Sequence, residues 1–155
     1  MVVRFFADAD GTAITVNGLR YRDMLTTFFW PLLDGMDIED MWFQQDGATC
    51  HTANDTMHLL RTKFHGRIIS GNSDASWPPR SPDLTPLDYF LWGHLKDRVY
   101  ANNPATIDAL KDNVRREIAA IGPNVCRTVI SNFTKRVDIC RRARGGHMED
   151  IIYHT

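Results

Sequence analysis

The chain has 155 residues, 43% of them hydrophobic and 24% charged, which is typical of a single globular domain and excludes a chain that is disordered throughout. The formal net charge of −1 excludes the strongly basic balance of a dedicated nucleic-acid binder. Acidic residues crowd the segment 34–46, however, and basic residues crowd 135–144. One surface could therefore still contact nucleic acid, or the basic run could be a solvated helix face.

Cysteine usage and hydropathy indicate the compartment. The three cysteines include no C-x-x-C pair, and Cys50, His51 and His58 lack the remaining ligands of a zinc site. An odd number of thiols and no signal peptide predict a reducing, intracellular compartment. No apolar run reaches the roughly 18 residues that a membrane span needs, so no membrane contact is expected.

The first half of the chain is predicted to mix strands and helices, because its apolar residues alternate between periods of about two and about 3.6. The first predicted element is a hairpin, or a strand and loop, over 2–16 with its turn at Asp10-Gly11. A helix follows over 21–33, which Pro31 should end or bend, and then a strand over 41–45. The last elements of this half are a helix over 52–64, with Thr52 as N-cap, and a strand over 67–70.

The second half is predicted to be helical. It begins with a loop over 71–85, where two proline-containing stretches exclude a helix or a central strand. The predicted helices cover 87–100, 106–121 and 124–144, with Gly145-Gly146 ending the last of them. No repeat, low-complexity segment or long linker divides the chain, so one α/β domain with a helical C-terminal half is expected.

Asp46 stands where the predicted strand over 41–45 ends. A side chain there projects from the carboxyl edge of a sheet, the usual place for chemistry in α/β folds. Gly47 would allow the backbone to turn sharply. Asp-Gly is also a common hairpin turn, and this alternative stays open, although the next segment resembles a helix and not a returning strand.

Asp88 falls in the first turn of the predicted helix over 87–100. With Thr85 as N-cap and Pro86 at N1, it would stand at N3, where its carboxylate could simply cap the helix. It would also share a helix face with three apolar residues, Leu91, Trp92 and Leu95. We therefore expect it to point toward the core, where an unpaired carboxylate costs several kcal/mol and needs a cation or a hydrogen-bond donor.

A strand-end aspartate and an inward helix aspartate can meet in space. Two carboxylates about 4 Å apart repel by roughly 4 kcal/mol at an effective dielectric constant near 20, so the charged pair needs a divalent cation between them. Mg²⁺ prefers such hard oxygen ligands, and two such ions can serve phosphoryl transfer.

Two segments resemble mariner-type DNA transposases. Residues 42–48, WFQQDGA, with His51 after them, resemble the family's second-aspartate segment, and residues 77–93, WPPRSPDLTPLDYFLWG, resemble its third-carboxylate segment. Residues 16–21, VNGLRY, and the C-terminal segment 143–155 resemble further parts of insect members. The resemblance therefore covers essentially the whole chain.

This resemblance implies an RNase H-like α/β fold and a DDE/DDD site, in which three carboxylates hold Mg²⁺ or Mn²⁺ for DNA strand cleavage and transfer. It makes Asp46 the second and Asp88 the third catalytic metal ligand. It also implies transposon-end DNA, a second copy or a full-length transposase as partners, and the nucleus as the compartment. His51 and Arg80 are candidate DNA contacts, although His51 could instead orient the site or cap the following helix.

The sequence departs from this family at its start. The family's first aspartate and its N-terminal helix-turn-helix region have no counterpart here, so we expect residues 1–155 to form a partial domain without the first strands of the sheet. Asp8 follows an apolar run, but it lies closer to Asp46 than the family's first aspartate does. It is therefore interpreted as an exposed loop acid.

The large aromatic residues are interpreted as core. Trp77 and Trp92 are expected to anchor the core rather than to stack on bases, and the same holds for the cluster Phe28, Phe29 and Trp30.

Three functions remain open. The favoured one is a fragment of a cut-and-paste DNA transposase, inactive alone, with weakened metal affinity because one anionic ligand is missing. The second is a reused module that binds nucleic acid or a partner without catalysis. The third is an active nuclease with a substitute first ligand such as Asp8.

Overall fold

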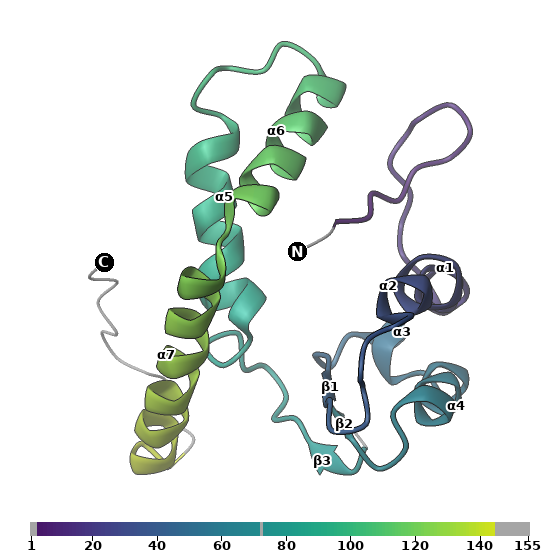
Figure 1. The fold of residues 1–155 in the computed structure, drawn as a ribbon, viewed down its shortest axis with the longest axis vertical. Helices are drawn as coiled ribbons and strands as arrows, with labels where there is room; N and C mark the ends of the chain where they lie inside the picture. Colours follow the sequence, from purple (N-terminus) through teal and green to yellow (C-terminus); the bar gives the residue numbers. More distant parts are fainter. Residues whose placement is uncertain (1–2, 72, 145–155) are drawn as a thin grey trace. The chain divides into compact units, whose positions relative to one another are not determined.

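The structure is a computed structural model that describes residues 3–71 and 73–144. It forms two compact units, shown with their elements in Figure 1. Residues 4–80 are called the sheet unit, and residues 81–144 with Val3 are called the helical unit. Gly145 and Gly146, which were predicted to end the last helix, lie outside the described residues, as do residues 147–155.

The sheet unit begins with a tight loop instead of two paired strands. Ala7 and Ala13 form a single antiparallel bridge. Between them the Asp8 carboxylate accepts the backbone N–H groups of Asp10 at 3.0 Å and Thr12 at 2.9 Å. Gly11 has a φ of +81°, which glycine adopts without steric cost. The predicted turn is confirmed. The predicted strands are wrong, because the backbone N–H groups of this loop bond to the Asp8 side chain and only one bridge pairs the two arms.

A continuous helical segment follows, made of α1 (Gly18–Met24), the π turn η1 (Leu25–Phe29) and α2 (Trp30–Leu33). It begins three residues earlier than predicted, because the Asn17 side chain accepts the N–H of Arg20 and caps it. In the π turn the N–H of Trp30 bonds the carbonyl of Leu25. Pro31 follows directly, and the segment continues to Leu33 despite the missing N–H group.

The sheet has three parallel strands in the order β1 (Phe43–Gln44), β2 (Ile68–Ser70) and β3 (Ala75–Ser76). Phe43 pairs with Ile68, and Ser70 pairs with Ser76. The first two strands confirm the prediction. The third was missed because it lies in the loop over 71–85, just before the prolines.

Two helices connect β1 with β2, namely α3 (Thr49–Thr52) and α4 (Asn54–Lys63). Thr52 was predicted to cap a single helix, and this is wrong. The extended backbone of Ala53 (φ −56°, ψ 139°) separates the two helices, and Thr52 closes α3 instead. The apolar face of α4 then packs on the long helical segment and β2, in a core of Tyr21, Leu25, Leu33, Met57, Leu60, Phe64 and Ile68.

Two residues of the predicted aromatic cluster belong to this core, whereas Phe28 does not and lies under the Arg4 guanidinium, 5.7 Å from its ring centroid. Phe29 and Trp30 pack against the core, and the Phe29 ring lies 5.7 Å from that of Phe43.

The helical unit consists of the π turn η2 (Leu87–Leu91), α5 (Trp92–Val99), α6 (Ile107–Ala120) and α7 (Pro123–Arg142). Leu91, Leu95, Val99 and Ile118 form a core between α5 and α6. Thr106 caps α6 by accepting the N–H of Ala109 at 3.1 Å. Ile107, in the first turn of α6, is 71% exposed and lies outside this core.

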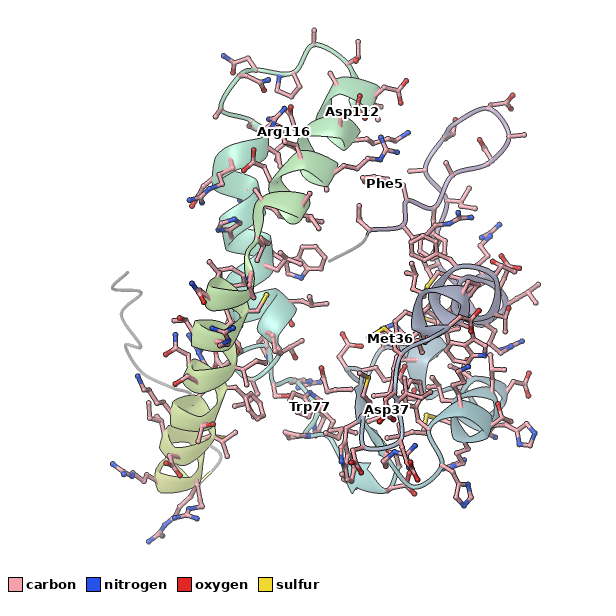
Figure 2. The ribbon with its side chains drawn as sticks, in the orientation of Figure 1. Phe5, Met36, Asp37, Trp77, Asp112 and Arg116 are labelled. Carbon is pink, nitrogen blue, oxygen red and sulfur yellow. The ribbon has the colours of Figure 1, made fainter. Side chains whose placement is uncertain are left out.

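The outer face of α6 is solvated. It carries charges of both signs, including Asp112 and Arg116, which are labelled in Figure 2. Among the described residues no helix is both long and apolar enough to cross a bilayer.

Candidate active site

Asp46 lies at the carboxyl end of β1, as predicted. The backbone N–H of the preceding residue, Gln45, still bonds the carbonyl of Ile69 at 3.0 Å, so the pairing with β2 reaches the residue before the carboxylate. The chain then enters α3, and the hairpin alternative is therefore wrong. The predicted need for Gly47 is also wrong, because its φ is not positive and a Cβ there would meet nothing within 4 Å.

The Asp46 carboxylate is oriented by its own turn. Oδ1 accepts the N–H of Ala48 at 3.0 Å and lies 2.5 Å from Nδ1 of His51. The side chain is 48% exposed, and Oδ2 has no hydrogen-bond partner among the described residues. One oxygen is thus held in place while the other is available, an arrangement that fits a hard cation such as Mg²⁺.

His51 lies beside the Asp46 carboxylate, and its role in orienting a catalytic site stays a prediction. Its ring lies against the Tyr21 ring, with 4.4 Å between centroids, and is bonded to Asp46 through Nδ1. The residue stands inside α3, so it does not cap α4. Contact of His51 with DNA stays a prediction.

Two buried residues behind Asp46 were missed by sequence reasoning. The hydroxyl of Tyr21 donates to Oε1 of Gln45 at 3.0 Å, in the core of the sheet unit. The only sequence signal for Gln45 was its place directly before Asp46 in the motif, and Tyr21 gave the signal of an ordinary apolar helix position.

The Tyr21 phenol makes the sheet unit sensitive to alkali. Burial raises the pKa of Tyr21 above its ordinary value of 10, and the nearby Cys50 and Asp46 raise it further. Because the unfolded chain ionises first, the stability from neutral Tyr21 is fully present below pH 10 and is lost as the pH rises toward the folded pKa. We expect a loss of about 1 kcal/mol between pH 8 and pH 10.5. Urea denaturation at both pH values should show this loss in the wild type and not in Tyr21→Phe.

Asp88 lies in the helical unit and is exposed, so the predicted inward orientation is wrong. The prediction assumed α-helical spacing, whereas η2 is a π turn in which the N–H of Trp92 bonds the carbonyl of Leu87. A π turn repeats its face about one residue later than an α-helix does. With this spacing Asp88 shares a helix face with Trp92 and Gly93, both of which are exposed. Leu91 belongs to the buried face instead.

The helical segment that carries Asp88 does not begin with the capping box that was the alternative prediction for this residue. The Thr85 carbonyl accepts the N–H groups of Asp88 at 2.9 Å and Tyr89 at 3.1 Å, whereas the Thr85 hydroxyl bonds the carbonyl of Ser81. Within the described residues the Asp88 carboxylate takes part in no hydrogen bond or ion pair. It too is free to bind a cation.

Arg136 holds the segment that carries Asp88, and sequence reasoning missed it too. Its side chain is buried on α7, with the guanidinium 4.3 Å above the Tyr89 ring. Nη1 donates to the Asp83 carbonyl at 3.1 Å. The Tyr89 hydroxyl in turn donates to the carbonyl of Val129 at 2.8 Å. These contacts fix both ends of the segment 83–89 to α7.

The remaining candidates are less well placed. Trp92 was expected in the core but is 53% exposed, because the π turn moves it away from Leu91 and Leu95. Trp77 is half-buried. Arg80 is exposed with a φ of +54°, and its contact with DNA stays a prediction.

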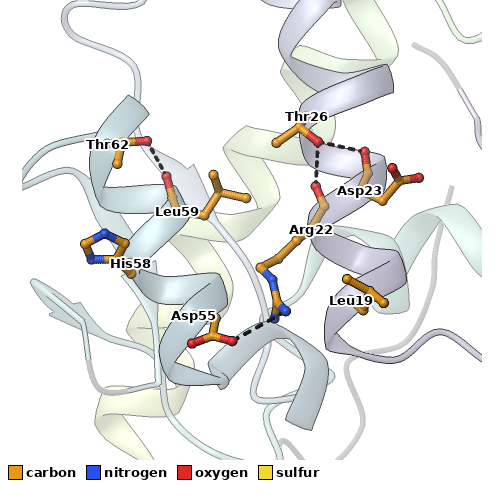
Figure 3. A pocket seen from close by; sticks show the side chains of 8 residues that line it. All are labelled: Leu19, Arg22, Asp23, Thr26, Asp55, His58, Leu59 and Thr62. Carbon is orange, nitrogen blue, oxygen red and sulfur yellow. Dashed lines mark hydrogen bonds and ion pairs between the residues drawn. The ribbon is translucent and has the colours of Figure 1, made fainter.

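An open hollow of about 600 Å³ lies between α1, η1 and α4 (Figure 3). Its walls are mainly apolar, with Leu19 and Leu59 facing an ion pair of Arg22 and Asp55 at 3.4 Å. It includes none of the predicted site residues. Over residues 3–71 and 73–144, no cluster of three or more His, Cys, Asp or Glu side chains is arranged to hold a metal.

Asp46 and Asp88 thus belong to different units, and their convergence stays a prediction.

Comparison with known proteins finds a similarity to a transposable-element protein. It is 30% identical over 132 residues to the transposable element Tc3 transposase of Caenorhabditis elegans. This match covers 84% of the chain and 38% of that protein, so the chain spans less than half of the length of this relative. No family model matches the chain.

Solved structures match the fold. Two structures of the Mos1 transposase catalytic domain with raltegravir, one with Mn and one with Mg, each align with a TM-score of 0.73 at 22% identity. Each match covers 88% of this chain and 67% of the Mos1 chain. The predicted RNase H-like α/β fold is thereby confirmed.

Proposed function

We propose that this chain, which is similar in sequence to the Tc3 transposase and in fold to the Mos1 catalytic domain, is part of the catalytic domain of a mariner/Tc1-type, cut-and-paste DNA transposase. We further propose that Asp46 and Asp88 are the second and third carboxylates of its metal site. The observation that carries this proposal is the Asp46 carboxylate at the end of β1, with Oδ1 held by the turn and Oδ2 free.

The cation would be Mg²⁺ or Mn²⁺, with both carboxylates as its ligands. Two such ions, when bound, would supply activation of the attacking oxygen and stabilisation of the leaving oxygen in phosphoryl transfer. The protein's own contribution is orientation. His51 and the Ala48 N–H hold Asp46, while Arg136 and Tyr89 hold the segment of Asp88.

The substrate would be transposon-end DNA in the nucleus, and the protein partner a second copy or a full-length transposase. Arg80 and His51 are the proposed DNA contacts. Asp8 is committed to its own turn and does not serve as a third carboxylate. We therefore expect weak metal binding and no strand transfer by the chain alone.

A shared cation can be tested by paramagnetic broadening. Titrating the ¹⁵N-labelled chain with Mn²⁺ should broaden the amide signals of Ala48 and Tyr89 at the same Mn²⁺ concentration, because one ion lies near both. Asp46→Asn should then abolish the broadening at Tyr89, and Asp88→Asn that at Ala48. As a control, Asp108→Asn changes an exposed acid that pairs with Lys111 on its own helix, and should alter neither signal. Broadening of the two signals independently of each other would refute the shared site.

A supercoiled plasmid with Mn²⁺ distinguishes the functions. No nicking is expected from the chain alone. Nicking that both Asn substitutions abolish would instead establish an active nuclease. Salt-dependent DNA binding that neither substitution affects would indicate a non-catalytic binding module.

A further inference from the structure

Gln45 lies where the chain passes from the core of the sheet unit to the proposed site. Gln45 is buried, with 5% of the whole residue exposed, whereas the side chain of the next residue, Asp46, is 48% exposed. The backbone of Gln45 is paired with β2 through the carbonyl of Ile69. The turn that presents Asp46 therefore starts from a buried, hydrogen-bonded residue.

Both the oxygen and the nitrogen of the Gln45 side-chain amide have hydrogen-bond partners. Oε1 accepts from the Tyr21 hydroxyl at 3.0 Å. Nε2 faces three acceptors, the carbonyl of His51 at 3.0 Å, the hydroxyl of Ser70 at 3.1 Å and the sulfur of Met57 at 3.4 Å. One side chain thus joins α1, β2, α3 and α4.

The bond from Gln45 to the His51 carbonyl closes the turn from inside. On the outside, the His51 ring and the N–H of Ala48 hold Oδ1 of Asp46. Hydrogen bonds of the Gln45 side chain, the Asp46 side chain and the backbone therefore hold both the first and the last residue of the segment 45–51 in place. Without the inner bond, α3 could shift and carry the His51 ring away from Asp46.

We infer that Gln45 is a positioning residue of the proposed metal site, which sets the direction of the Asp46 carboxylate by fixing His51 and the turn between them. The inference rests on the proposed function. An apolar side chain of the same length could fill the same space, but it could not bond the His51 carbonyl. Groups that hold a metal ligand in place in this way commonly contribute a factor of 10 to 100 in metal affinity.

The test compares Gln45→Met with Leu60→Val. Methionine keeps the length of the side chain and removes its hydrogen bonds, while Leu60→Val loosens the core of the sheet unit and removes no hydrogen bond. We expect Gln45→Met to weaken Asp46-dependent Mn²⁺ binding about tenfold. Leu60→Val should leave it within about twofold of wild type. Equal affinity in Gln45→Met and wild type, or an equal loss in Leu60→Val, would overturn the inference.

A second measurement uses the metal-free chain. Long-range ¹H–¹⁵N spectra should show the His51 ring in a single tautomer in wild type and Leu60→Val, because Nδ1 is bonded to Asp46. In Gln45→Met the ring should show the averaged signals of a free histidine, and an unchanged ring would contradict the inference. If wild type binds no Mn²⁺ at Asp46, the proposed function fails, while this second measurement still decides the role of Gln45.

Discussion

Replacing Arg136 with methionine is expected to lower the free energy of unfolding by about 3 kcal/mol. The substitution removes a desolvated cation from the Tyr89 ring and a charge-assisted hydrogen bond from the Asp83 carbonyl. Such a cation–π contact contributes about 2 kcal/mol, a hydrogen bond to a charged group about 1.5–3 kcal/mol, and the two overlap because one group makes both. Urea denaturation followed by circular dichroism measures the loss.

The matched control for Arg136→Met is Arg127→Met. Arg127 is exposed on the same helix, α7, and its hydrogen bond at 2.8 Å is to the side chain of Asn124 in the preceding turn. This substitution should change the free energy of unfolding by less than about 0.5 kcal/mol. Similar losses in both variants would mean that the buried position of Arg136 is not the cause. Arg136→Lys should recover only part of the loss, because lysine keeps the charge without the planar fork.

Replacing Leu60 with alanine is expected to cost about 3 kcal/mol in the sheet unit. Leu60 is fully buried on α4, in the core between the long helical segment and β2. Its loss leaves a cavity that the surrounding side chains fill only in part, and the cost adds to the lost transfer free energy. The free energy of unfolding from urea denaturation tests the expectation.

The control for Leu60→Ala is the same substitution at Leu19, which is 70% exposed on α1. Leu19→Ala should leave the free energy of unfolding almost unchanged, since little apolar surface is uncovered. A loss at Leu19 as large as that at Leu60 would show that the core of the sheet unit lies elsewhere.

The local signals in the sequence were sufficient for most elements. Thr106 caps the start of α6 and Pro123 begins α7, and both positions are close to the predicted starts of these helices. The short β-prone run before Asp46 forms β1, which ends one residue before the predicted end of the strand. These features depend on neighbouring residues, whose capping, proline geometry and apolar spacing can be read in order along the chain.

The orientation of Asp88 could not be predicted in this way. Apolar residues at Leu91 and Leu95 indicated an α-helical face that would include Asp88. The π turn shifts this face, and no residue in the segment predicts it from spacing alone. The π turn occurs where Tyr89 packs under Arg136 and donates to the carbonyl of Val129. Both of these residues are on α7, which lies far from Tyr89 along the sequence.

The sequence by itself determined the α/β order of elements, the strand end at Asp46 and the motifs that relate the chain to transposases. Only the tertiary structure decided which residues hold the two carboxylates in place. Gln45 and Tyr21 are 24 residues apart, and Arg136 and Asp83 are 53 apart. Local sequence patterns carry no record of such pairs, because burial in a shared core, and not spacing along the chain, brings their polar atoms together.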